Sequence, residues 1–446
     1  MMQRENNERK WEVMRTYFLL DLDCFFASVE MARQPALRGL PVCIGGPRDA
    51  RGIVACPNYE ARRYGVRTAM PLRTAARLLP PSAVFLPGNH ALYGEYSRNV
   101  MGILRDFTPD VEQVSVDEAY MDVTGCLHFW GHNPERMARA VKERIVQQCG
   151  LGVSIGIAAN KVCAKIAAGV QKPDGLVIVP RGTEREFLAP LPVEVIPGVG
   201  VKTLPKLHAC ALRTVGDAMD RAARTGAAAS HSPLDSLCAH IAACAIPSDE
   251  PLMVEEQVEK SISRDRTFNE DTDDAEKILA TLYSLAERCC KTLRQDGLRA
   301  STVTVRIRFS DFTTPQRQST LAAPTSNEED IFAAAQRLLT LLLPPTALIR
   351  LVGIKVSGLK SLPAGEAGKQ VGAAEGEQLS LDLPAGPGGS IRSVLLNGKT
   401  PQGRTAGLPA ERLDALHRRL DGLQSRFGDA SIRWGILCAG GEREEE

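Results

Sequence analysis

The feature that most constrains the fold is a short apolar run that ends in an acidic residue. After Thr16, residues 17–22 are aromatic or aliphatic except for Asp21, so residues 16–22 show a pattern typical of a buried strand. Farther along the chain, Asp117 and Glu118 stand in SVDEAYMD, at the turn of an expected hairpin over residues 111–123. Charged residues at the ends of buried strands are costly unless something compensates them.

Divalent metal ions are the usual compensation for three clustered carboxylates. Mg²⁺ prefers hard oxygen ligands, and two such ions about 3.5–4 Å apart can stabilise the attacking and leaving oxygens of a phosphoryl transfer. The alternative is that these residues are ordinary turn acids, which are common in hairpins. Either segment taken alone favours that simpler interpretation.

Composition limits the class of protein. The 446 residues suggest about three domains, and 44% apolar with 24% charged residues excludes disorder throughout. The 54 basic and 53 acidic residues give a net charge of +1, so any grip on nucleic acid must come from local patches. No apolar stretch is long enough to predict a membrane span, and the polar N-terminus does not resemble a signal peptide.

The twelve cysteines are scattered and form no C-x-x-C pair. This pattern favours reduced, mostly buried thiols over a zinc site or a disulfide framework. We therefore expect a cytoplasmic protein.

Strand and helix patterns alternate in the first part of the chain. Beyond the first strand, helices are expected at 92–106, 134–149 and about 160–170, with a strand at 153–158. This alternation predicts an α/β sheet covered on one face.

The next part looks all-helical over 181–249, and a charged connector leads to a second α/β unit. That unit is expected to contain helices 275–296 and 327–343 and strands 301–309 and 348–357. Its basic residues cluster, so one face could be basic; they are Arg288, Lys291, Arg294, Arg299, Arg306 and Arg308.

The C-terminal part is rich in Gly, Ala, Pro and Glu, which predicts a flexible tail over 359–407. The apolar residues Leu379, Leu381 and Leu383 are typical of a peptide that docks into a partner's groove; an internal docking strand is the alternative. Residues 409–427 then carry leucines at helical spacing.

Several segments together resemble the Y-family translesion DNA polymerases, most closely the DinB-like polymerase IV group. They are LLDLDCFFASVE, NYEARRYGVRTAMP, SVDEAYMD, GIAANKVCAKIAAGVQKPDG and IPGVG. The resemblance runs in family order over about three-quarters of the chain.

The resemblance implies a multi-domain α/β and α+β fold, a right-hand polymerase with palm, small fingers, helical thumb and an α/β little-finger domain. It places the palm at 1–24 and 89–180, the fingers at 25–88, the thumb with a helix-hairpin-helix at 181–249, a linker at 250–260, the little finger at 261–358, the tail at 359–407 and a C-terminal helical extension at 408–446.

The resemblance also implies roles for the acidic residues. Asp21, Asp117 and Glu118 would be catalytic and would hold two Mg²⁺ ions, with the Leu22 carbonyl as a further ligand. Asp23 is not among the family's usual ligands and is interpreted as a structural or solvated acid.

The nucleotide pocket is implied in the same way. Phe26 would exclude a ribose 2′-OH, although a core aromatic like its neighbour Phe25 is the alternative. Three residues would contact the triphosphate, namely Tyr59, Arg62 and Lys172. Solvated helix charges are the alternative for the arginine, Lys165 is ambiguous between site and surface, and Ile53 and Ala55 would roof the new base pair.

DNA contacts are expected in two places. Gly198 and Gly200 would let a phosphate approach the backbone beside Lys202, although an ordinary turn is the alternative. Arg306 and Arg308 would lie on one face of a strand.

The expected partners are primer-template DNA, dNTPs and a sliding clamp, with no membrane, for a monomeric enzyme. The clamp would bind a tail peptide made of Gln378, Leu379, Leu381 and Leu383.

The predicted function is therefore low-fidelity translesion DNA synthesis without proofreading. A catalytically inactive, polymerase-like DNA-repair accessory protein is the alternative. A nucleotide cyclase with a palm-like carboxylate site is a weaker third candidate.

Overall fold

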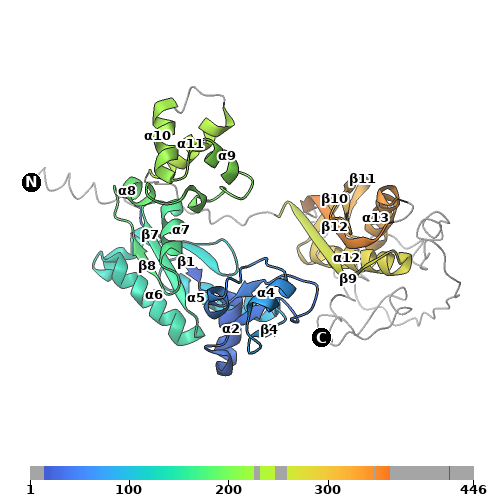
Figure 1. The fold of residues 1–446 in the computed structure, drawn as a ribbon, viewed down its shortest axis with the longest axis horizontal. Coiled ribbons are helices and arrows are strands. Elements are labelled where there is room, and N and C mark those ends of the chain that lie inside the picture. Colours follow the sequence, from blue (N-terminus) through green and yellow to red (C-terminus); the bar gives the residue numbers. More distant parts are fainter. Residues whose placement is uncertain (1–14, 226–231, 247–258, 345–346, 362–420, 422–446) are drawn as a thin grey trace, which may run out of the picture. The chain divides into compact units, whose positions relative to one another are not determined.

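The computed structural model describes residues 15–225, 232–246, 259–344 and 347–361, together with Asp421. The chain divides into two compact units, Met1–Glu256 and Gln257–Glu446 (Figure 1). Each unit mixes helices and strands, so the predicted multi-domain α/β and α+β class is confirmed. None of the described helices is long and apolar enough to cross a membrane.

A five-stranded sheet in the order β5–β6–β1–β7–β8 forms the centre of the first unit. Its strands are β1 (Tyr17–Leu22), β5 (Val111–Gln113), β6 (Glu118–Asp122), β7 (Val153–Ala158) and β8 (Leu176–Ile178). β1 runs antiparallel to both β6 and β7. The expected first strand, the hairpin and the strand at 153–158 are thus confirmed.

Helices cover both faces of this sheet, so the expectation of a one-sided cover is wrong. Phe18 belongs to the core formed with α5 (His90–Arg105) and α6 (Pro134–Cys149). Its neighbour Leu19 belongs to the opposite core, formed with α7 (Lys161–Val170) and the helical region described below. Strands buried on both faces lack polar alternation, and the apolar runs of β1 and β7 fit this requirement.

Two smaller parts complete the first unit. One is a three-stranded sheet in the order β3–β2–β4, with three helices near it. Its elements are β2 (Val42–Ile44), β3 (Cys56–Pro57), β4 (Val84–Leu86), α2 (Phe25–Arg33), α3 (Tyr59–Arg63) and α4 (Leu72–Leu78).

The other part is helical, as expected for 181–249. Its described elements are α8 (Glu184–Leu188), η3 (Val193–Val195), α9 (Leu204–Ala209), α10 (Val215–Thr225) and α11 (Pro233–Ala243).

The second unit is a four-stranded antiparallel sheet in the order β11–β10–β12–β9, with two helices packed on one face. Its elements are β9 (Ser261–Thr272), α12 (Ala275–Gln295), β10 (Leu298–Phe309), β11 (Gln316–Thr325), α13 (Glu328–Leu342) and β12 (Ile349–Ser361). The sequence predicted both helices and two of the strands but missed β9 and β11. These are the edge strands and bury few side chains, so their sequences lack the apolar alternation of a half-buried strand.

The described cysteines are free thiols, and most of them are buried. Among them Cys210 is exposed, and Cys126 and Cys149 are half-buried. The distribution agrees with the expected structural role.

Arg294 does not belong to a basic surface, which corrects the predicted cluster. Its side chain is only 5% exposed. It pairs with Glu328 on α13 at 2.7 Å and with Asp421 of the C-terminal extension at 2.8 Å. Because it faces two carboxylates, Arg294 neutralises charge inside the second unit instead of presenting it to a ligand.

We expect Arg294→Ala to lower the free energy of unfolding of the second unit by about 3–5 kcal/mol, because Glu328 would be left buried without its cation. Arg288→Ala on the exposed side of the same helix is the matched control and should change it by less than about 0.5 kcal/mol. Denaturant unfolding followed by circular dichroism measures both. Equal losses in the two variants would contradict this role.

Candidate active site

The three predicted carboxylates lie at the same end of neighbouring strands. In the antiparallel register between β1 and β6, Asp21 is the partner of Glu118. The N–H of Leu22 donates to the carbonyl oxygen of Asp117 at 2.9 Å. The hairpin therefore brings Asp117 and Glu118 to the strand that carries Asp21.

Burial is the largest influence on the ionisation of Asp21. It raises the pKa of Asp21, the Lys172 ammonium opposes the shift, and the charges of Asp117 and Glu118 add smaller contributions that raise it. A carboxylate that is half-buried beside two others is stabilised by positive charge close by.

Two lysines supply positive charge in the structure. Lys172, just after α7, pairs with Asp21, and Lys165 within α7 pairs with Glu118. As the side chains stand, no three acidic, His or Cys residues in the described ranges are gathered closely enough to hold a metal ion. Lys165, which the sequence left ambiguous between site and surface, places its ammonium against Glu118.

α7 lies directly against β7, which explains how its lysine reaches the carboxylates. A Cβ on Gly156 of β7 would lie 2.0 Å from the carbonyl oxygen of Ala164. Only glycine allows this approach.

Phe26 is held in place by aromatic neighbours. It begins α2 together with Phe25, which is buried in the core as expected. The Phe26 ring is half-buried and stacks on Tyr93 with centroids 4.4 Å apart, and His90 meets it edge-on at 5.6 Å. The sequence did not reveal that Tyr93 supports the Phe26 ring, because the spacing of Tyr93 in α5 indicates only a core position.

Tyr59 and Arg62 lie together on α3. Asn58 caps this helix by accepting a hydrogen bond from the N–H of Ala61 at 2.9 Å. The Arg62 guanidinium lies 4.9 Å from the centre of the Tyr59 ring, and the Tyr59 hydroxyl donates to Asp23 at 3.1 Å. Burial and the Asp23 charge raise the Tyr59 pKa, so the phenol keeps its proton at neutral pH.

Asp23 is buried, which excludes the solvated interpretation left open for it. Its side chain is 4% exposed, and the hydroxyl of Ser154 on β7 donates to it at 2.9 Å. A serine inside the apolar strand VSIGIA is the sequence signal that could have revealed this partner.

Ile53 and Ala55 are exposed, near the three-stranded sheet. Ile53 forms an isolated bridge with Pro71. The predicted roof residues are thus on a surface.

The predicted phosphate loop is a glycine turn in front of α9. Gly198 has φ +93°, a conformation that favours glycine. The carbonyl of Gly200 accepts from the N–H of Leu204, the first residue of the helix. Lys202 is exposed and belongs to this turn.

Arg306 and Arg308 lie on the sheet face opposite α12 and α13, because the alternating residues Val305 and Ile307 point into the helix-covered core. The predicted alternation is confirmed. Both arginines also have partners within the chain, since Arg306 pairs with Asp265 and the Arg308 Nε donates to Thr314 at 3.0 Å.

Gly353 lies between Arg306 and its partner. In the strand register, Gly353 of β12 is opposite both Arg306 of β10 and Asp265 of β9. A Cβ at this position would lie 1.7 Å from Asp265 Oδ1. The Asp265 side chain therefore crosses the middle strand over a glycine to reach the arginine.

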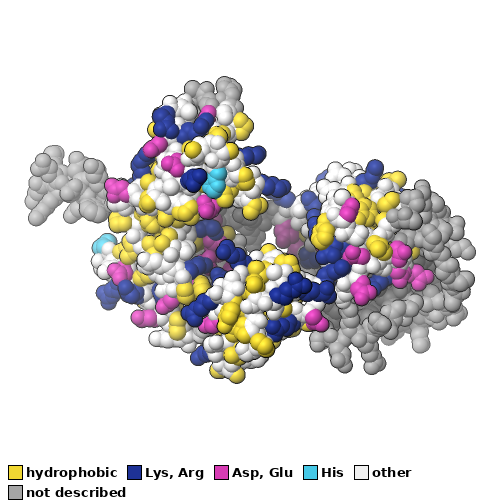
Figure 2. Space-filling model, in the orientation of Figure 1, with side chains coloured by type: hydrophobic (Ala, Val, Ile, Leu, Met, Phe, Trp, Pro, Cys, Tyr) yellow, Lys and Arg dark blue, Asp and Glu magenta, His cyan; other side chains and the backbone are white. Residues whose placement is uncertain are grey.

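Basic side chains are unevenly distributed in the first unit. Figure 2 shows Lys and Arg side chains gathered over the region of α4, where Arg73 and Arg77 are exposed. This fits the expectation that a nearly neutral chain carries local basic patches.

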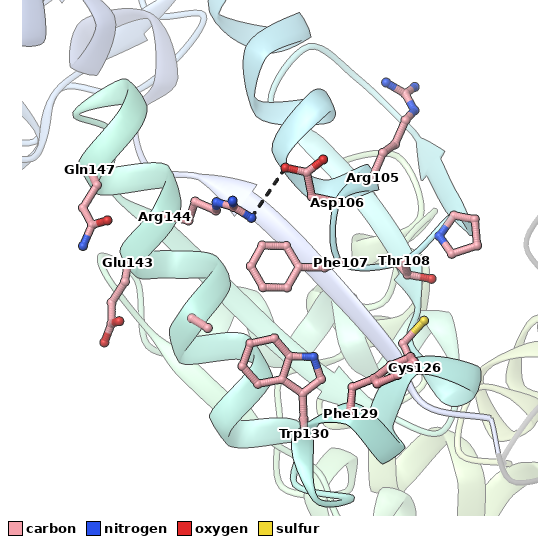
Figure 3. A pocket seen from close by; sticks show the side chains of 12 residues that line it. Arg105, Asp106, Phe107, Thr108, Cys126, Phe129, Trp130, Glu143, Arg144 and Gln147 are labelled. Atoms are coloured by element: carbon pink, nitrogen blue, oxygen red, sulfur yellow. Dashed lines mark ion pairs between the residues drawn. The ribbon is translucent and has the colours of Figure 1, made fainter.

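A surface hollow of about 630 Å³ lies elsewhere, between the end of α5 and α6 (Figure 3). Side chains of its wall contact one another. The Phe107 and Trp130 rings stack with centroids 5.8 Å apart, and the Arg144 guanidinium pairs with the Asp106 carboxylate at 3.5 Å. It contains none of the predicted site residues, so it does not mark the reaction centre.

Two predicted features lie outside the described residues. They are the clamp-binding peptide and the C-terminal helix at 409–427, of which only Asp421 is described. That residue is helical and contacts Arg294.

Comparisons with known proteins agree with this geometry. The model of the impB/mucB/samB family matches residues 20–169, and the model of that family's C-terminal domain matches 259–372. A DNA polymerase IV of Dehalococcoides mccartyi is 41% identical, with 77% of this chain and 87% of the relative covered. DNA polymerase IV 2 of Mesorhizobium japonicum is 36% identical over 96% of this chain and 95% of its own length.

A solved structure has a similar fold. A Y-family DNA polymerase chimera of Dbh and Dpo4 superposes with a TM-score of 0.68 at 25% identity, covering 78% of this chain and all of that one. The predicted right-hand polymerase fold, with its little-finger domain, is thereby confirmed. The chain belongs to the impB/mucB/samB family and is a DinB-like Y-family DNA polymerase, a DNA-directed enzyme.

Proposed function

We propose that this polymerase carries out low-fidelity translesion synthesis, adding dNTPs to a primer 3′-OH by a two-metal-ion phosphoryl transfer. The observation that carries the proposal is the register that pairs Asp21 with Glu118 and places Asp117 beside Leu22. The inactive accessory protein is disfavoured, because the carboxylates and their basic neighbours occur together.

The residues present fit magnesium. The donors are carboxylate oxygens of Asp21, Asp117 and Glu118, with the Leu22 carbonyl at the same strand end, and these are hard ligands. Burial and mutual repulsion of the carboxylates call for compensating positive charge, which the two lysines supply in the structure. When bound, Mg²⁺ would neutralise triphosphate charge and favour ionisation of the primer hydroxyl.

The chain's own residues would orient the nucleotide. Tyr59 would donate a hydrogen bond and Arg62 a planar, two-pronged contact to phosphate oxygens. Lys172 would add a point charge beside Asp21, and Phe26, locked against Tyr93, would leave no volume for a 2′-OH. Such positioning and electrostatics supply most of what a protein contributes to phosphoryl transfer.

DNA would be held by separate contacts in the two units. The turn containing Gly198, Gly200 and Lys202 would take a backbone phosphate through its N–H groups. The open sheet face carrying Arg306 and Arg308 would take others. A sliding clamp would bind Gln378, Leu379, Leu381 and Leu383, with the enzyme acting as a monomer.

Replacing Asp117 with Ala should reduce primer extension by at least about a hundredfold, because a metal ligand would be lost. Primer-template affinity, measured by fluorescence anisotropy, should stay the same. Glu143→Ala, an exposed carboxylate on α6 outside the site, is the control and should extend primers normally. Normal extension by the Asp117 variant would refute the proposed site.

Phe26→Ala should admit ribonucleotides and lower the preference for dNTPs over rNTPs by at least about tenfold, because the ring that fills the 2′ position is removed. Single-nucleotide insertion kinetics with paired dNTP and rNTP measure this ratio. A thermal-unfolding curve checks that loss of the stack on Tyr93 has not unfolded the chain. Unchanged sugar discrimination in a folded variant would remove the assignment.

Deletion of residues 378–383 should leave basal synthesis intact and abolish stimulation by a sliding clamp. Deletion of residues 386–391, of equal length in the same Gly/Pro-rich segment, is the control and should keep the stimulation. Primer extension with and without clamp measures both, and stimulation that survives the first deletion would show that the anchor lies elsewhere.

A further inference from the structure

Asp23 forms a buried hydrogen-bond junction two residues beyond Asp21. Its Oδ1 accepts from the Tyr59 hydroxyl at 3.1 Å and from the Ser154 hydroxyl at 2.9 Å, and its Oδ2 accepts from the Asp174 N–H at 2.8 Å. A carboxylate in a low-dielectric interior is tolerated when such donors satisfy it. All three of these donors are neutral groups.

The three donors come from three different parts of the first unit. Tyr59 belongs to α3 beside the three-stranded sheet, Ser154 to β7 of the central sheet, and Asp174 to the turn after α7. Asp23 itself is fixed to the central sheet, because its N–H donates to the Gly152 carbonyl at 3.0 Å. The junction therefore links two sheets and the turn that follows Lys172.

The turn is also held from its outer side. The Lys142 ammonium donates to the carbonyls of Asp174 at 2.8 Å and Gly175 at 3.0 Å. Asp174 has φ +58°, a left-handed conformation that is uncommon for non-glycine residues. Contacts on both sides thus fix the backbone that presents Lys172 to Asp21.

We propose that Asp23 is a positioning residue that sets the Tyr59 hydroxyl and the Lys172 turn relative to the catalytic carboxylates. The inference deepens the proposed function, because it assumes that Tyr59 and Lys172 bind the triphosphate. Asp23 neither touches the nucleotide nor holds a metal ion. It fixes the distance between Tyr59 and Lys172, which must bind the same triphosphate. Nucleotide affinity depends on such preorganisation.

Asp23→Asn tests the proposal with little change in side-chain volume. The Tyr59 hydroxyl and the Asp174 N–H donate to different oxygens of the Asp23 carboxylate. An amide has a single acceptor oxygen, so at these two positions it can accept from only one of the two donors. We expect the KM for dNTP to rise about tenfold, with kcat reduced less than about threefold and primer-template affinity unchanged.

Asp122→Asn is the matched control. Asp122 is also a buried carboxylate, 5% exposed, but it lies at the other end of β6 and pairs with Arg15 at 2.5 Å. We expect this variant to lose thermal stability while its KM for dNTP stays the same. A stability loss with unchanged KM in Asp23→Asn as well would overturn the proposal and leave Asp23 a structural residue.

A double-mutant cycle with Tyr59→Phe gives a second readout. If Asp23 acts through the Tyr59 hydroxyl, the KM increase of the double variant will be smaller than the product of the single increases. Independent effects, or a loss of kcat with unchanged KM, would overturn the proposal. If Asp23→Asn does not fold, Ser154→Ala combined with Tyr59→Phe tests the same junction by the same criterion.

The proposed function and the positioning role of Asp23 are tested by different variants. Normal extension by Asp117→Ala would overturn the proposed function itself. Inactive Asp117→Ala together with an unchanged KM in Asp23→Asn would overturn only the positioning role.

Discussion

The site depends on positive charge placed beside carboxylates that the strand register brings together. The antiparallel register of β1 and β6 leaves Asp21 opposite Glu118, with Asp117 one residue away, at the end of two strands whose other residues are buried. Like charges at such an end destabilise it unless cations lie nearby. Lys165 and Lys172, both delivered by α7 and the turn after it, meet this requirement within the chain.

The sequence predicted the centre of the fold more completely than its edges. β1 and β7 are apolar on both faces, and α6 is amphipathic and capped by Asn133, so their positions could be read from local pattern. The edge strands β9 and β11 bury few side chains and left no such pattern. Cover on both sheet faces was missed, because the alternation of helices and strands does not say on which side each helix packs.

The site could be predicted as a set of residues, but its internal connections could not. Spacing and resemblance singled out Tyr59 and Lys172 as separate phosphate contacts. Nothing in their spacing shows that Tyr59 and the turn after Lys172 both hydrogen-bond to Asp23. Arg294 shows the opposite error, since a basic residue on a helix was taken for surface charge although two carboxylates enclose it. Both cases depend on contacts between segments that are remote in the sequence.

Gly353 gives the open face of the little-finger sheet an adjustable charge. Asp265 reaches Arg306 only through the space that the missing Cβ leaves on the middle strand. One added methyl group there would displace the acid and release the guanidinium, so the electrostatic potential of this face would become more positive although no ionisable residue had changed. A residue that carries no charge therefore sets the electrostatic potential of this sheet face.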